Sequence, residues 1–101
     1  MSSELRFEWD IRKAETNLRK HKVSFELAAQ IFDDPFVLEF EEGNDHGETR
    51  FRAIGQSFGQ LFCVSYTSFE ESGDEVIRII SARKATHKER RAYQGHSQTH
   101  R

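Results

Sequence analysis

Apolar and charged residues alternate from Leu5 to Trp9, which is the period of a half-buried strand. Asp10 follows, and its carboxylate suits a helix N-cap because it can accept hydrogen bonds from the first free N–H groups of a helix. A first helix is therefore predicted to run from about residue 11 to His21. Its apolar positions recur at helical spacing; they are Ile11, Ala14 and Leu18.

A second helix is predicted to begin after Ser24, which is also a favourable N-cap residue. The helix is predicted to end at Asp33-Asp34-Pro35, because proline disfavours a helical conformation in the residue before it. The two helices, joined by residues 21–23, are predicted to form a helical hairpin. The second helix has a broad apolar face made of Phe25, Ala28, Ala29, Ile31 and Phe32.

Four later stretches have the alternation or the β-branched and aromatic content of strands. They cover about residues 36–40, 50–57, 61–69 and 75–80. The polar stretch Glu41–Thr49 is predicted to be a mobile loop between strands. In the strand at 50–57, the period of two places Arg50, Arg52 and Ile54 on one face and Phe51 with Ala53 on the other.

A last helix is predicted to begin at about His87, because Thr86 and Glu89 have the spacing of a capping box. Gly95 is the predicted C-terminal stop of this helix. Residues 96–101 contain no apolar side chain and are predicted to be disordered, which leaves one domain at residues 1–95.

The element order is therefore β-α-α-β-β-β-β-α. Four consecutive strands joined by short loops predict an antiparallel sheet, and helices on one face of that sheet make the fold class α+β.

Composition supports one small folded domain of 101 residues. Hydrophobic residues make up 36% and charged residues 32%, so the predicted core is thin, although 12% aromatic residues argue against disorder. The single cysteine, Cys63, lies in an apolar run and is predicted to be a buried structural thiol. No membrane-spanning run or signal peptide is recognised, so a cytoplasmic setting is expected, and no metal or cofactor site is predicted.

Charge is segregated along the chain, although the net charge is only -2. From Ser24 to Thr49 there are eight acidic residues and no Lys or Arg, whereas from Arg83 to the end there are six basic residues and one acid. Such segregation indicates either two surfaces that meet different partners or two ordinary solvated faces.

Arg78 interrupts the most apolar run of the chain, Val76–Ile80. A cation in such a strand needs a partner or solvent. Arg83, Lys84 and the basic helix follow directly. Basic groups on a rigid strand beside further basic groups and a phenol suit phosphate chemistry.

Several literal stretches stand at specific spacings between Arg6 and Tyr93. They are Phe7-Glu8-Trp9-Asp10, Lys13, Asn17, Leu18-Arg19-Lys20-His21, Val23-Ser24-Phe25-Glu26, Ala28-Ala29, Phe32-Asp33-Asp34-Pro35, Glu48-Thr49-Arg50, Ile54-Gly55, Arg78-Ile79-Ile80-Ser81-Ala82-Arg83-Lys84-Ala85-Thr86, Glu89-Arg90 and Tyr93. With them the chain resembles the BrnT family of toxins from type II toxin–antitoxin systems. One departure is Lys22, where the family often has glycine.

The resemblance implies a RelE-like fold and a ribonuclease that arrests translation. It also implies neutralisation by a BrnA-type antitoxin, whose ribbon-helix-helix domain would let the complex bind operator DNA. The implied ribonuclease is metal-free and uses the 2′-hydroxyl of the RNA as nucleophile. The protein must then move two protons and stabilise the charge that develops on the phosphate.

Arginine suits the phosphate, because its planar fork binds two oxygens at once. Arg78, Arg83 and Lys84 are the leading candidates, followed by Arg50 and Arg52, and the alternative for each arginine is a surface salt bridge. Tyr93 lies four residues after Glu89 and either donates to the leaving group, stacks on a base or packs its helix on the sheet. His21 is a candidate general base at a helix C-terminus, where any protonatable side chain is favoured.

A second hypothesis is a non-catalytic module that binds nucleic acid or protein. The basic surface would then hold its partner without cutting it, and the toxin–antitoxin complex would act mainly as a transcriptional repressor. Salt-dependent RNA binding without a cleavage product would distinguish this module from the ribonuclease.

Overall fold

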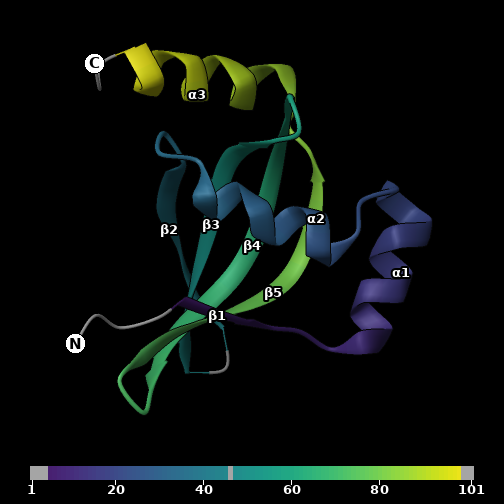
Figure 1. The fold of residues 1–101 in the computed structure, drawn as a ribbon, viewed down its shortest axis with the longest axis vertical. Helices are drawn as coiled ribbons and strands as arrows, with labels where there is room; N and C mark the ends of the chain where they lie inside the picture. Colours follow the sequence, from purple (N-terminus) through teal and green to yellow (C-terminus); the bar gives the residue numbers. More distant parts are fainter. Residues whose placement is uncertain (1–4, 46, 99–101) are drawn as a thin grey trace.

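Five strands form one mixed sheet in the order β1-β5-β4-β3-β2 (Figure 1). This computed structural model describes residues 5–45 and 47–98. The strands are β1 (Leu5–Glu8), β2 (Leu38–Asp45), β3 (Glu48–Ser57), β4 (Gln60–Glu71) and β5 (Asp74–Lys84). The four later strands pair antiparallel in sequence order, as predicted, and the α+β class is confirmed.

The first strand makes the sheet mixed rather than antiparallel throughout. β1 pairs parallel with β5, which places Glu8 directly beside Arg78. The two helices and three strands that separate β1 from β5 in the sequence supply the crossover that a parallel pair requires. The first and last strands of the chain are therefore neighbours.

The two predicted N-terminal helices form, each with its predicted cap. In α1 (Ile11–His21), Asp10 Oδ1 accepts from the backbone N of Arg12 at 2.7 Å and of Lys13 at 3.2 Å. In α2 (Phe25–Ala29), Ser24 Oγ accepts from the backbone N of Leu27 at 3.1 Å. A 3₁₀ turn, η1 (Gln30–Asp33), continues α2, and Lys22 between the helices has φ 61°, the left-handed conformation that favours glycine.

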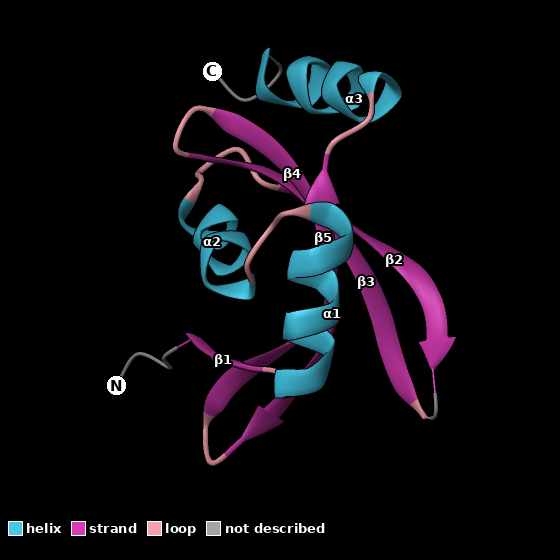
Figure 2. Cartoon of the chain, turned by 90° about the vertical axis from the view of Figure 1, so that its right-hand side faces the viewer, coloured by secondary structure: helices cyan, strands magenta, loops and turns pink. Residues whose placement is uncertain are grey.

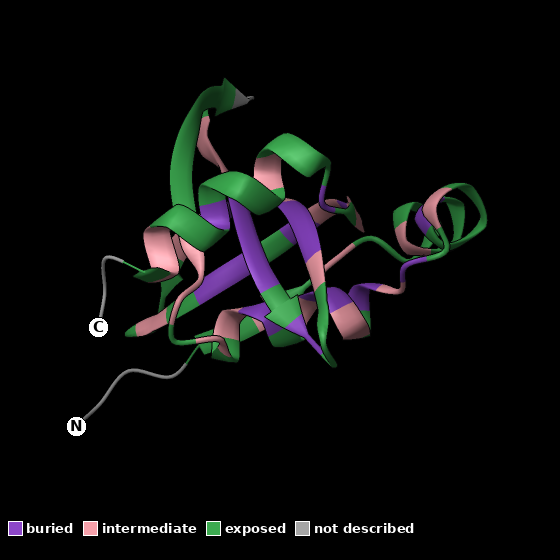
Figure 3. Cartoon of the chain, turned by 90° about the horizontal axis from the view of Figure 1, so that it is seen from above, coloured by how far each residue is buried: buried purple, intermediate pink, exposed green. Residues whose placement is uncertain are grey.

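Figure 1 shows α2 lying across the face of the sheet, and Figure 2 shows α1 standing beside β5. The main core lies between α2, η1 and this face. Figure 3 shows buried stretches, in purple, along the strands of the sheet. Aromatic rings interlock there: Phe32 meets Tyr66 edge-on at 5.1 Å between ring centroids, and Trp9 meets Phe25 at 5.8 Å. Aromatic residues thus make up for a small aliphatic core.

Gly55 permits the closest approach between η1 and the sheet. A Cβ atom at this position would lie 2.8 Å from Ile31 Cβ and 3.1 Å from the carbonyl oxygen of Ile31. Only a residue without a side chain therefore lets η1 sit directly on β3.

Asn17 is the one residue of α1 that is buried, at 5% exposure. Its Nδ2 donates to the carbonyl oxygens of Ala82 at 2.8 Å and Val23 at 3.0 Å, and its Oδ1 accepts from Ala82 N at 3.1 Å. The side chain therefore pairs with the outer edge of β5 as a neighbouring strand would. The predicted apolar positions of α1 contribute less, because Ile11 and Leu18 are exposed.

Two predicted boundaries are wrong. The stretch Glu41–Thr49 is not a loop, because β2 continues to Asp45 and β3 begins at Glu48, with a bulge between Glu41 and Gly43. Gly95 does not end the last helix, α3, which spans His87–Gln98; residues 96–98 are therefore helical. The rest of the predicted tail, Thr99–Arg101, lies outside the described residues.

The third helix also departs from the prediction that all helices cover one face. Figure 1 shows α3 lying across the end of the sheet. Its Tyr93 forms a second buried cluster with Ile54, Cys63 and Ala85, whereas their strand neighbours Ala53 and Val64 belong to the main core. Because neighbouring residues of a strand point to opposite faces, α3 covers one end of the face opposite α2. No helix in the described ranges is long and apolar enough to cross a membrane.

Candidate functional site

Arginine side chains gather on the face of the sheet opposite α2, here called the arginine face. Pairing places Arg50, Thr67 and Arg78 in one row across β3, β4 and β5, and Ile54, Cys63 and Arg83 in another. Arg52, opposite Ser65, lies between these rows. The rows are four residues apart on β4, or about 13 Å. The predicted placement of Arg50, Arg52 and Ile54 on one face is confirmed.

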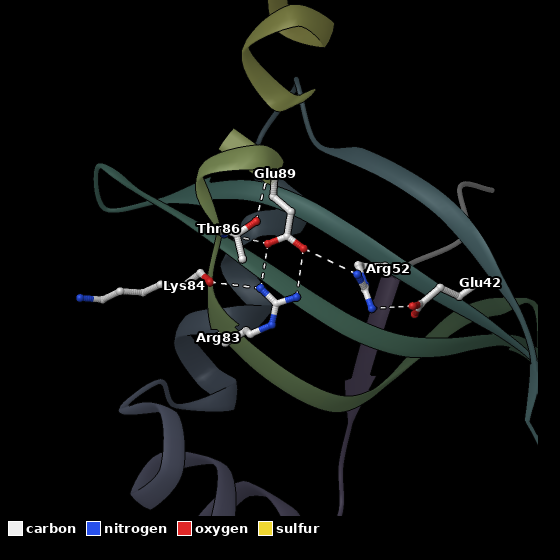
Figure 4. Close-up of polar contacts among 6 residues, drawn as sticks. All are labelled: Glu42, Arg52, Arg83, Lys84, Thr86 and Glu89. Carbon is white, nitrogen blue, oxygen red and sulfur yellow. Dashed lines mark hydrogen bonds and ion pairs between the residues drawn. The ribbon is translucent and has the colours of Figure 1, made fainter. Parts of the chain in front are cut away.

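Arg83 and Glu89 form a two-point ion pair on this face (Figure 4). Arg83 Nη1 donates to Glu89 Oε1 at 2.7 Å, and Nη2 donates to Oε2 at 3.0 Å, so both oxygens of the carboxylate are engaged. Glu89 Oε1 also accepts from Thr86 N at 2.8 Å, and Thr86 Oγ1 accepts from Glu89 N at 3.2 Å. The predicted capping box is confirmed, and it fixes the carboxylate that orients Arg83.

The pKa of Glu89 is lowered to about 2, chiefly by the hydrogen bonds from Arg83. The folded pKa lies below the unfolded one, so this carboxylate stabilises the fold above about pH 4.5 and loses that contribution as the pH falls toward 2. We expect about 3 kcal/mol of unfolding free energy to disappear over this interval. Urea unfolding between pH 2 and pH 7 measures it.

Glu89→Gln should reduce the fall in unfolding free energy between about pH 4.5 and pH 2. Glu15→Gln, on the exposed surface of α1, should leave that fall unchanged. If Glu89→Gln lost as much unfolding free energy at low pH as the unmodified chain, Glu89 would not be the cause of that loss.

Arg52 approaches the same carboxylate from β3. Figure 4 shows Arg52 and Arg83 pointing toward Glu89 from two sides, with Glu42 beyond Arg52. Arg52 Nη2 lies 2.5 Å from Glu42 Oε1, and Nη1 lies 3.6 Å from Glu89 Oε2. Glu89 therefore ties β3, β5 and α3 together at one point.

Cys63 lies in the same cross-strand row as Arg83 and is 3% exposed. Burial is the main reason that its pKa is raised to about 12, and the neighbouring carboxylate of Glu89 raises it further. A thiol with such a pKa stays protonated near neutral pH and is a poor nucleophile. The prediction of a buried structural thiol is confirmed.

Arg78 stands at the other end of the arginine face and is paired with two carboxylates. Its Nε and Nη2 donate to Glu8 Oε1 at 3.0 and 2.9 Å, and its Nη1 donates to Glu48 at 3.0 and 3.1 Å. The guanidinium carbon also lies 4.9 Å from the centroid of the Phe69 ring, within cation–π range. These bonds, led by those that Arg78 donates to Glu8, raise the pKa of Arg78 above its usual value.

Tyr93 is held at the junction of α3 and η1. Its hydroxyl donates to Asp34 Oδ2 at 2.6 Å, and the same oxygen accepts from Gln56 N at 2.8 Å. Burial and this bond raise the pKa of Tyr93 to about 12. Tyr93 is 8% exposed, so its observed contacts dock α3 on the sheet.

Lys84 and His21 lie apart from the Glu89 group. Figure 4 shows the Lys84 side chain pointing away from Glu89, and it lines a hollow of about 310 Å³ with Arg90 and Tyr93. His21 is half-buried and lines a different hollow, of about 380 Å³, between α1 and β5.

The carboxylates that fix the arginines were not predicted. Glu8 and Glu48 lie 70 and 30 residues from Arg78 in the sequence, and Glu42 lies 10 residues from Arg52 in the stretch predicted to be a loop. The sequence favours a capping role for Glu89 and gives no sign of its bonds to Arg83. The available signal was their strand period, since Glu48 shares the parity of Arg50 and Arg52 along β3. Within residues 5–45 and 47–98, no group of three or more His, Cys, Asp or Glu side chains is arranged to hold a metal ion.

Comparison with known families identifies the chain. Residues 9–89 match the model of a family described as the ribonuclease toxin BrnT of type II toxin–antitoxin systems. The match includes β3, β4, β5 and the capping box of α3, and therefore all four arginines of the arginine face. Comparison with curated proteins gave no match. Because the family model covers more than half of the sequence, the chain belongs to the BrnT family of ribonuclease toxins from type II toxin–antitoxin systems.

Proposed function

We propose that the chain is an RNA-cleaving toxin whose arginine face binds the phosphodiester backbone. The observation that carries this proposal is the clustering of Arg50, Arg52, Arg78 and Arg83 on one face of two rigid strands. Forks held on a sheet can bind phosphate oxygens in a fixed geometry, which is what charge stabilisation in a transition state requires.

The two ends of this face are suited to different tasks. Arg78 and its partners are about half exposed, with side-chain exposures of 45%, 47% for Glu8 and 35% for Glu48. Exposed ion pairs contribute little to stability, so a phosphate can replace these carboxylates at low cost. Arg78 therefore suits capture of the RNA backbone.

Arg83 suits the reacting phosphate. Its partner Glu89 is only 13% exposed and stays ionised, so the fork is held in place before the substrate binds. Arg83 makes three described bonds, two to Glu89 and one to the carbonyl oxygen of Lys84. A guanidinium has five N–H donors, so others are left for a phosphate oxygen.

The proposed reaction is transesterification. The 2′-oxygen attacks phosphorus, its proton leaves to a base, and the bond from phosphorus to the 5′-oxygen breaks as that oxygen takes up a proton. Glu89 is a weak base because of its low pKa, and Tyr93 already donates to Asp34. We assign positioning roles to both residues. The proton steps then fall to side chains outside the Glu89 group, for which the exposed Lys84 and the half-buried His21 are the candidates.

Membership of the family supplies the biological setting of the proposal. Cleavage of RNA would inhibit translation, and a BrnA-type antitoxin with a ribbon-helix-helix domain would neutralise the toxin and carry the complex to operator DNA. The proposed step uses no metal, because the RNA supplies the nucleophile and the arginines supply the positive charge beside the phosphate.

We expect the purified chain to cleave single-stranded RNA in the presence of EDTA and to leave 2′,3′-cyclic phosphate ends. DNA of the same sequence, which lacks the 2′-hydroxyl, should stay intact. Expression of the chain should arrest growth, and co-expression of a BrnA-type antitoxin should restore it. Intact RNA together with unimpeded growth would contradict the proposal.

A second candidate function is favoured by the pairing of Arg52, Arg78 and Arg83 with carboxylates of the same chain. A face balanced in this way would suit a binding module that cuts nothing and acts with the antitoxin as a repressor. Salt-dependent RNA binding without cyclic phosphate products would support this alternative.

A further inference from the structure

A hollow of about 360 Å³ lies beside the Arg52–Glu89 contact, between β2, β3 and α3. Phe40, Ile54 and Ala92 supply its apolar surface, and Arg52, Lys88 and Glu89 its charged rim, together with Thr86. Small-molecule sites have this size and this mixture of apolar walls and a few polar groups. The hollow includes Arg52 of the arginine face, and the proposed cleavage step does not use its apolar walls.

Phe40 is the feature that points to an aromatic ligand. It pairs with Arg52 across β2 and β3, and it is 40% exposed. The core aromatics Phe7, Trp9, Phe32 and Tyr66 each pack against another ring, whereas within the described part of the chain Phe40 contacts none. An exposed ring on a strand is a stacking platform for an unpaired base.

The rim determines which base edge fits. Lys88 and Arg52 supply N–H donors, whereas the oxygens of Glu89 already accept from Arg83 and Thr86. Donors match the O6 and N7 acceptors of guanine, and they do not match the N6 amino group of adenine.

We propose that this hollow is a nucleobase subsite that stacks a base on Phe40 and prefers guanine to adenine. The inference rests on the proposed function, because it assigns the base that flanks the phosphate held by Arg83. It adds a source of cleavage-site preference that the arginines alone cannot supply, since phosphate contacts carry no sequence information.

The test measures binding of guanosine 3′-monophosphate, adenosine 3′-monophosphate and ribose 5-phosphate by titration calorimetry. We expect guanosine 3′-monophosphate to bind most tightly. Phe40→Ala should weaken its binding about tenfold and leave ribose 5-phosphate unaffected. Phe58→Ala is the matched control, because Phe58 is a second exposed phenylalanine, 80% exposed, at the β3–β4 turn.

Ala92→Trp is a second variant, which fills the hollow from α3 without removing Phe40. Ala92 is exposed, so the larger side chain need not disturb the core. This variant should also weaken binding of guanosine 3′-monophosphate about tenfold or more. Thermal melting of all three variants is the check that each of them folds.

The inference is overturned if both 3′-nucleotides bind no better than ribose 5-phosphate, or if adenosine 3′-monophosphate binds as tightly as guanosine 3′-monophosphate. It is also overturned if neither Phe40→Ala nor Ala92→Trp weakens binding of guanosine 3′-monophosphate. RNA cleavage with unchanged site preference in Phe40→Ala would also overturn it while leaving the proposed function intact. Phe40-dependent binding without any RNA cleavage would instead contradict the proposed function alone.

Discussion

Replacing Arg83 with alanine is expected to lower the rate of RNA cleavage by a factor of about 10²–10³, the cost of removing one donor to the developing charge. Growth arrest on expression should disappear with it. The reason is geometric, because Glu89 holds the fork from α3 and the carbonyl of Lys84 holds it from β5. Single-turnover cleavage of an RNA oligonucleotide measures the loss.

Two further variants distinguish the effect of the planar guanidinium of Arg83 from the effect of its positive charge. Arg83→Lys keeps a cation beside Glu89 but cannot engage two oxygens through one planar group, so it should recover only a small part of the rate. Arg91→Ala removes an exposed cation of α3 and should retain most of the activity. A folded Arg83→Ala protein that cleaves as fast as the unmodified chain would refute the assignment of Arg83.

Replacing Asn17 with alanine is expected to lower the free energy of unfolding by about 3 kcal/mol. The change leaves three buried backbone groups without partners, which are the N–H and C=O of Ala82 and the C=O of Val23. It also separates α1 from the edge of β5. Urea unfolding monitored by Trp9 fluorescence measures the effect.

Thr16→Ala is the matched control, since Thr16 is the exposed neighbour of Asn17 on the same helix and should change stability by no more than about 0.5 kcal/mol. Asn17→Asp should destabilise at least as much as Asn17→Ala, because its carboxylate would face two carbonyl oxygens. An Asn17→Ala protein as stable as Thr16→Ala would show that water replaces the lost bonds.

Local chemistry explains which parts of the fold were predictable. Asp10, Ser24 and the Thr86–Glu89 pair act on backbone groups two or three residues away, so their caps can be recognised in sequence alone. The pairing of β1 with β5 depends on residues about 70 positions apart, and no local pattern encodes it. The length of β2 was missed because acidic residues on an edge strand resemble those of a loop.

In the candidate site, too, the features set by local sequence were predictable and those set by long-range pairing were not. Strand period correctly placed Arg50 and Arg52 on one face, because alternation is a local property. The partners of Arg78 come from β1 and from the start of β3, and the partner of Tyr93 lies 59 residues earlier in the sequence. The arginines could therefore be found from the sequence, whereas the carboxylates that orient them required the sheet order.

The position of β1 beside β5 also bears on when a nascent chain can become harmful. Among the described strands, β1 is synthesised before the others and has no partner until β5 follows. Arg78 and Arg83 both arrive on that last strand, and Glu89 follows them on α3. Long-range pairing of this kind slows folding. A nascent chain that ends before β5 lacks Arg78 and Arg83 and therefore cannot contain the assembled arginine face. The residues of the arginine face therefore come together only late in synthesis, after β5 has paired with β4.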